Sequence, residues 1–275
     1  MKNNLKIHLL VIDPQNDFMD QPNSALPVAG ATADMKRLAA FINNNGKKFA
    51  DIHVTLDSHQ VVDIAHPVWW VNSKGQTPAP YTLITADDIE AGIWTPRDPS
   101  VRQRSLEYAR SLEKTGKFLL FIWPPHCLIG TWGHSVQEDL MKSLLEWQAV
   151  QYAMVDFVTK GTNPYTEHYG GLLAEVPDSQ DPSTQLNTHL LQTLQEADII
   201  LIAGEALSHC VKETLNQIAD NIGPEHVKKI QILTDCTSPV PAVPNGPDFP
   251  AIAEQWLKDM QKRGVQLTTT TSFFN

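Results

Sequence analysis

The sequence predicts an α/β protein with one open, mainly parallel sheet of about six strands. Short runs rich in Val, Ile and Leu alternate along the 275 residues with longer amphipathic segments. This alternation is typical of parallel strands joined by crossover helices. A chain of this length can bury one large core, with or without an insertion, so we expect a single domain over residues 1–275.

The predicted strands and helices follow one another in order along the chain. Residues 5–13 form the first strand, which is rich in Leu and Ile and ends in an aspartate. Residues 31–45 form the first helix, because Met35, Leu38 and Ile42 recur at helical spacing. The other predicted strands are 49–57, 152–161, 198–205, 227–235 and 265–271, and the other predicted helices are 183–197, 209–222 and 249–264.

The strand–helix alternation weakens between residues 72 and 121, where turn signals surround one predicted helix at 101–115. We interpret this segment as an insertion over one edge of the sheet. It is either an excursion without a role of its own or a lid or oligomer contact. The Pro-rich stretch 238–250 predicts a loop.

Composition excludes several classes of partner. The 21 basic and 31 acidic side chains give a net charge of −10, so the basic surface that would bind nucleic acid is missing. The apolar run LLVI near the start is too short for a signal peptide or a membrane span, which predicts a soluble, cytoplasmic protein. Three cysteines (Cys127, Cys210 and Cys236) are an odd number, which argues against a disulfide framework.

Three reactive or charged residues follow the predicted strands at the edge where parallel sheets bind ligands. Asp13, Lys160 and Cys210 each lie at or just beyond a strand end. A thiol at a helix N-terminus is stabilised as thiolate, so Cys210 is placed for nucleophilic attack. Asp13 could take the thiol proton and return it to a leaving amine, with Lys160 holding the pair in register. Taken singly, each residue could equally be a packed thiol, a turn residue or a solvated strand end.

A second group of residues has the donor types of a metal site. Asp57 and His59 stand two residues apart after a predicted strand, and a distant His can complete a site for Zn, Fe or Mn. Asp63, His66 and His126 are further candidates for ligands. An isolated His is more often a surface or core residue, so the spacing alone is weak evidence.

Five motifs in order, VIDPQNDF, LDSH, WPPHCLIGTWG, VTKGTNPY and GEALSHCVKET, resemble those of the isochorismatase-like cysteine hydrolases, particularly nicotinamidases. The resemblance spans nearly the whole chain except 72–121. It implies a three-layer α/β/α fold and a catalytic triad. Within that triad Cys210 is similar to the nucleophile, Asp13 to the proton-transferring acid and Lys160 to the third member.

The same resemblance implies a metal centre. Asp57, His59 and His126 are similar to the family's ligands, with His66 as a tentative fourth and Asp63 as its alternative. The implied cofactor is a divalent ion, zinc first, with Fe, Mn and Mg as alternatives. In the family this ion grips the pyridine nitrogen of nicotinamide and turns the amide toward the thiolate.

The loop before the nucleophile carries two further implications of the resemblance. A cis peptide bond is expected between Glu205 and Ala206, so that the backbone N–H groups of Ala206 and Cys210 form an oxyanion hole. The family often has an acid two residues before the Cys, where this chain has Ser208. We expect His209 to point away from the nucleophile's face.

Aromatic residues near the motifs are candidates for substrate binding. Phe18, Trp69 and Trp132 could pack against an aromatic substrate, although aromatic side chains more often serve core packing. The function predicted is a metal-assisted amidohydrolase that converts the carboxamide of nicotinamide or a related small amide to acid and ammonia through a thioester. The alternatives are a vinyl-ether hydrolase of the isochorismatase type, an N-carbamoyl amide hydrolase, and a non-catalytic scaffold. By resemblance we expect a homo-oligomer.

Overall fold

The computed structural model describes residues 5–242 and 247–275. Its centre is a six-stranded sheet in the order β10-β9-β8-β1-β2-β7, and every neighbouring pair is parallel. The prediction of a six-stranded parallel sheet is therefore confirmed. The strands are β1 (Ile7–Ile12), β2 (Phe49–Asp57), β7 (Asp156–Lys160), β8 (Ile199–Gly204), β9 (Ile230–Leu233) and β10 (Gln266–Thr268).

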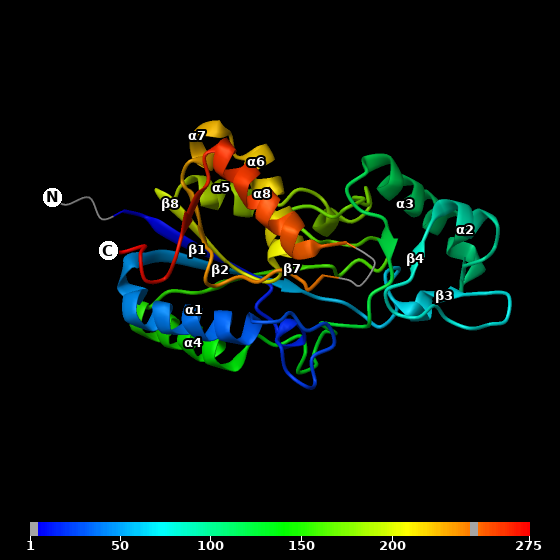
Figure 1. The fold of residues 1–275 in the computed structure, drawn as a ribbon, viewed down its shortest axis with the longest axis horizontal. Helices are drawn as coiled ribbons and strands as arrows, with labels where there is room; N and C mark the ends of the chain where they lie inside the picture. The colour runs from blue at the N-terminus through cyan, green and yellow to red at the C-terminus, as the bar shows by residue number, and fades with distance from the viewer. Residues whose placement is uncertain (1–4, 243–246) are drawn as a thin grey trace.

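Helices cover both faces of the sheet, which gives the three-layer α/β/α arrangement that the resemblance implies (Figure 1). One face is covered by α1 (Ala31–Asn45) and α4 (Glu138–Gln151). The opposite face is covered by α5 (Thr188–Gln195), α6 (Lys212–Asn221), α7 (Pro224–Val227) and α8 (Phe249–Arg263).

The alternation of side chains along β1 shows why both faces need a helical layer. Leu9 and Val11 enter the core on the α1 side, whereas Leu10 and Ile12 enter the core on the α6 side. A strand that is buried on both faces is almost entirely apolar. All six residues of β1 are buried, and five of them are apolar; His8 is the exception.

Helix α4 was missed by the sequence reasoning, although the signal for it is present. Leu140, Leu144 and Trp147 recur at helical spacing and are buried. The Gln137 side chain also caps the helix by accepting a hydrogen bond from the backbone N–H of Leu140. The predicted helix 183–197 is shorter in the structure because Asn187 caps α5 at its N-terminus.

Residues 70–121, which begin two residues before the segment interpreted as an insertion, form a lobe beyond the carboxyl ends of the strands (Figure 1). It has a small apolar core of its own, which includes Trp70, Ile89, Tyr108 and Leu112. Its elements are β3 (Trp70–Val71), β4 (Leu83–Ile84), α2 (Ala86–Glu90), β5 (Thr95–Pro96), α3 (Arg102–Thr115) and β6 (Leu120–Phe121).

Within the described residues, no helix combines the length and apolarity needed to cross a membrane. Of the predicted loop 238–250, residues 243–246 lie outside the part of the chain that the structure describes.

Candidate active site

The sheet has a topological switch point between β1 and β8, and two of the predicted catalytic residues flank it. Asp13 directly follows β1, and Cys210 lies in a tight turn (Leu207–Val211) that follows β8. The chain leaves β1 toward β2 on one side and leaves β8 toward β9 on the other. Such a divergence opens the crevice in which parallel sheets bind ligands.

Lys160, the last residue of β7, brings the predicted catalytic residues together. Its Nζ lies 3.0 Å from Oδ2 of Asp13 and 3.8 Å from Sγ of Cys210. It also lies 3.0 Å from Oδ1 of Asp57 and donates a hydrogen bond to the carbonyl of His168 at 2.8 Å. Lys160 therefore joins the other two predicted catalytic residues, Asp13 and Cys210, to the predicted metal ligand Asp57.

Burial and neighbouring charges shift the pKa values of Cys210, Asp13 and Lys160. Burial raises the pKa of the Cys210 thiol well above its ordinary value, and the Lys160 ammonium only partly opposes it. Burial also raises the pKa of Asp13, against the pull of Lys160. Burial alone would lower the pKa of Lys160. The carboxylates of Asp13 and Asp57 outweigh this effect and hold the pKa of Lys160 well above its ordinary value. The expectation that the helix start lowers the pKa of Cys210 is therefore wrong, because desolvation outweighs it.

Asp13 is held in place by its neighbour on β2. The Thr55 hydroxyl donates to Oδ1 of Asp13 at 2.6 Å and accepts a hydrogen bond from the Asp13 backbone N–H at 3.0 Å. This pairing fixes Asp13 in a left-handed conformation (φ 44°) and leaves its Oδ2 toward Lys160.

The predicted metal ligands Asp57, His59 and His126 come together in a second buried cluster. Their potential ligand atoms all lie within 4.8 Å of one another. Nε2 of His59 is 3.1 Å and Nε2 of His126 is 3.3 Å from Oδ2 of Asp57. The His66 ring lies beside both imidazoles, with centroid distances of 5.3 and 5.7 Å.

Hydrogen bonds fix the orientation of all three imidazoles. Nδ1 of His59 contacts Oδ2 of Asp63 at 3.1 Å, Nδ1 of His126 contacts the Pro124 carbonyl at 2.9 Å, and Nδ1 of His66 contacts the Gln60 carbonyl at 3.1 Å. Each Nδ1–H donates to one of these oxygens, so Nε2 is the nitrogen that a metal ion would bind in each ring.

Of the two candidates for a further ligand, His66 and Asp63, the hydrogen-bond contacts favour His66. Nε2 of His66 is buried without a hydrogen-bond partner among the described residues, so its lone pair is uncommitted. Asp63 instead accepts a hydrogen bond from Nδ1 of His59 and so orients its ring. Carboxylates commonly orient metal-binding histidines in this way. One carboxylate and three imidazole nitrogens fit a divalent transition metal such as zinc.

Two motif residues position the ligand Asp57. The side-chain amide of Gln15 donates to the Asp57 carbonyl at 2.7 Å, and its oxygen accepts from the Asp57 backbone N–H at 2.7 Å. Gly161 has φ 78°, and a Cβ there would lie 2.9 Å from Oδ1 of Asp57 and 3.1 Å from the His59 ring. These contacts account for the Gln and Gly of VIDPQNDF and VTKGTNPY.

One cavity of about 50 Å³ reaches both clusters. Its lining includes Cys210 and Ala206 as well as Asp57 and His126. The peptide bond between Glu205 and Ala206 is cis, as the resemblance implies. The remaining wall is mainly apolar or aromatic and consists of Phe18, Leu26, Pro27, Val28, Trp123, Glu167, His168, Tyr169, His209 and Val240.

Of the three aromatic residues predicted to contact the substrate, one lines the cavity and two do not. Phe18 lines the cavity and packs edge-on against His126. Trp69 is not part of the described cavity wall, because it is buried in the lobe and its Nε1 donates to the Ser105 hydroxyl. Trp132 is also absent from that wall and lies half exposed on the loop after the WPPHC motif.

Trp123, Tyr169 and His209 belong to the cavity wall and were missed. The expectation that His209 points away from the site is wrong, because its ring packs 5.9 Å from Trp123 and 6.3 Å from Tyr169, centroid to centroid. Glu167 was also missed. Its Oε1 lies 3.7 Å from Nε2 of His59, and its backbone N–H donates to the lobe's Tyr108 hydroxyl.

The fold is that of the isochorismatase-like proteins, because solved structures similar to this chain include nicotinamidases, pyrazinamidases and an isochorismatase family protein. Yeast nicotinamidase Pnc1p is 20% identical, with 95% of this chain and 99% of that chain covered and a TM-score of 0.62. The pyrazinamidase of Pyrococcus horikoshii in complex with zinc is 20% identical, with 96% and 99% covered and a TM-score of 0.54.

The isochorismatase family protein of Desulfovibrio vulgaris is 15% identical, with 97% of this chain and 95% of that chain covered and a TM-score of 0.52. No protein-family model and no curated protein matches the sequence. At these identities the comparisons establish the fold.

Proposed function

We propose that the protein is a metal-assisted cysteine amidohydrolase that cleaves the carboxamide of nicotinamide or a related small amide. The observation that supports this most strongly is that one cavity is lined by both the Cys210 thiol and the cluster residues Asp57 and His126. A small ring held at the cluster would present its amide carbon to the thiol. The solved nicotinamidase and pyrazinamidase that share the fold are consistent with an amidase.

The first chemical step is attack by the thiol. Cys210 passes its proton to Asp13, whose raised pKa makes it a better proton acceptor than an ordinary carboxylate. The thiolate then bonds to the amide carbon, and the backbone N–H groups of Ala206 and Cys210 stabilise the oxyanion. Asp13 returns the proton to the nitrogen, the C–N bond breaks, and ammonia leaves a thioester on Cys210. Water hydrolyses the thioester and restores the thiol.

Lys160 stabilises the charges that this exchange creates. Its ammonium lies within 3.8 Å of the Cys210 sulfur and 3.0 Å of the Asp13 carboxylate, so it faces the negative charge wherever the proton moves. Asp57, His59, His126 and His66 would hold the metal ion, with zinc favoured by the three imidazoles. When bound, the ion supplies a Lewis acid that orients and polarises the substrate.

The test is ammonia release by the purified full-length protein from nicotinamide, pyrazinamide, N-carbamoyl compounds and aliphatic amides, with and without a chelator. We expect turnover of a small aromatic amide that the chelator suppresses. Cys210→Ala should reduce turnover by at least about 10⁴-fold, whereas Cys236→Ala, in the apolar core, should not.

The outcomes separate the alternatives. Ammonia release that survives Cys210→Ala would overturn the nucleophile assignment. Turnover of N-carbamoyl compounds alone would favour the carbamoyl hydrolase. Cleavage of isochorismate, assayed as an additional substrate, together with no ammonia release from any amide, would favour the vinyl-ether hydrolase. The cytoplasmic location and the homo-oligomer stay predictions.

A further inference from the structure

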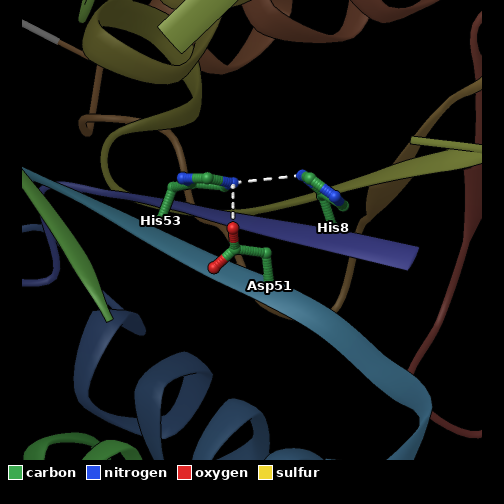
Figure 2. Close-up of side chains that lie close together, drawn as sticks. All are labelled: His8, Asp51 and His53. Atoms are coloured by element: carbon green, nitrogen blue, oxygen red, sulfur yellow. Dashed lines mark hydrogen bonds and ion pairs between the residues drawn. The ribbon is translucent and has the colours of Figure 1, made fainter. Parts of the chain in front are cut away.

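A third group of potential ligands lies at the opposite, amino end of the same strands. His8, Asp51 and His53 place three ligand atoms within 4.8 Å of one another. Figure 2 shows the two imidazoles facing each other from β1 and β2, with the Asp51 carboxylate beside His53. Nδ1 of His8 is 3.2 Å and Oδ2 of Asp51 is 3.9 Å from Nε2 of His53.

Strand register explains why these residues meet. His8 pairs with Asp51 across β1 and β2, after a register irregularity between Ile7 and His8. His53 pairs with Asp156 across β2 and β7. His53 and Asp57 are four residues apart on β2, so this cluster lies about 13 Å along the strand from the candidate active site.

The hydrogen bonds around His53 present a lone pair to the cluster. Its Nδ1 contacts Oδ2 of Asp156 at 2.9 Å, which places the proton on Nδ1 and leaves Nε2 as a ligand. Nε2 of His8 is buried without a partner among the described residues. With that proton on Nδ1 of His53, Nδ1–H of His8 donates to Nε2 of His53 at 3.2 Å. A zinc ion between the two nitrogens would therefore bind the other neutral tautomer of His8, in which the proton lies on Nε2.

We propose that His8, His53 and Asp51 form a second, previously unassigned zinc site, with Asp156 as the carboxylate that orients His53. Zinc–nitrogen bonds of about 2.0–2.1 Å in a tetrahedron separate ligand atoms by about 3.3 Å. The observed separations of 3.2 and 3.9 Å are close to that geometry. Both histidines are 1% exposed, whereas the Asp51 side chain is 35% exposed, so water can fill the fourth position.

Two imidazoles with one carboxylate are a ligand set suited to zinc rather than to magnesium or calcium. The ion would tie β1 to β2 at the amino end of the sheet. Because none of His8, Asp51 and His53 lines the cavity that contains the Cys210 thiol, we assign this cluster a structural role.

The experiment counts bound zinc. The full-length protein is stripped with a chelator, dialysed against Zn²⁺ and measured for zinc per chain. We expect two equivalents in the wild type, one in His53→Gln, one in His59→Gln and none in the double variant. His226→Gln, which changes a histidine paired with Glu225 on the surface, should keep two.

A partly exposed ligand gives a second variant if His53→Gln does not fold. Asp51→Asn, made in the His59→Gln background, should weaken zinc binding at least about ten-fold while the circular dichroism spectrum is unchanged. The second site would be overturned if the wild type binds one equivalent of zinc, His53→Gln still binds it and His59→Gln does not. The His8, His53 and Asp51 cluster would then be a hydrogen-bond chain without a metal ion. One equivalent that His53→Gln removes would support the second site and instead contradict the metal centre of the proposed function.

Discussion

The two ends of β1 and β2 carry clusters with the same construction and different surroundings. At each end a carboxylate orients one histidine through Nδ1: Asp63 for His59 at the carboxyl end, and Asp156 for His53 at the amino end. At the carboxyl end, the loop after β8 adds the Cys210 thiol, the last residue of β7 adds Lys160, and both line or adjoin the cavity that reaches Asp57 and His126. The comparison teaches that strand register can bring potential metal ligands together at either end, whereas the proposed catalytic group also needs the loops at the switch point.

The largest expected effect comes from replacing the central lysine. Lys160→Met leaves Asp13 and Asp57 buried without their counter-charge, so the free energy of unfolding should fall by about 3–5 kcal/mol and ammonia release should be lost. The matched control at the amino end is Lys229→Met, which removes hydrogen bonds to the carbonyls of Gln195 and Ala197 and should cost about 1–2 kcal/mol. Urea unfolding measures both, and equal losses would refute the central role of Lys160.

The second effect tests whether the two clusters share a design. Asp63→Asn should weaken zinc binding at the carboxyl-end centre by about 10–100-fold, because His59 loses its orienting carboxylate. Asp156→Asn should have an effect of similar size at the amino-end centre. Competition with a chromophoric chelator measures both affinities. A change at only one end would show that the resemblance between the clusters is superficial.

A smaller effect is expected from the glycine behind the carboxyl-end cluster. In Gly161→Ala, the positive φ should lower the free energy of unfolding by about 1–2 kcal/mol. The added Cβ would also lie 2.9 Å from Oδ1 of Asp57. Stability, zinc affinity and ammonia release should all decline. Gly116→Ala has a similar φ of 67° with nothing within 4 Å of the added Cβ, so only stability should decline. If both variants keep full zinc affinity, the close contact at Gly161 is unimportant.

The sequence predicted the parts of the molecule that depend on local pattern. Helix α1 has the predicted bounds because its apolar spacing is regular and Gly30 and Gly46 flank it. Motif residues such as Asp13 and Lys160 could be placed at one sheet edge because strand ends converge there.

What the sequence did not predict depends on long-range packing. Trp69 and Trp123 each follow a β-branched apolar residue in the sequence, but the first is buried in the lobe and the second lines the cavity. His209 could not be placed because the tight turn before α6 changes the direction that helical spacing implies for its side chain. The amino-end cluster arises from a register irregularity in β1 and β2, for which the sequence has no signal.

The smallest expected effect concerns the cavity wall at the carboxyl end. Burial lowers the pKa of His209 to about 4, and Lys212 adds to the shift. As the pH falls, His209 is therefore protonated near pH 6.5 in the unfolded chain but only near pH 4 in the folded protein. Stability should fall as pH falls through this window, by less than about 1 kcal/mol between pH 7 and 6. His209→Phe keeps a ring against Trp123 and should remove that part of the pH dependence. Parallel slopes of Tm against pH in the two proteins would show that His209 is solvated rather than part of the wall.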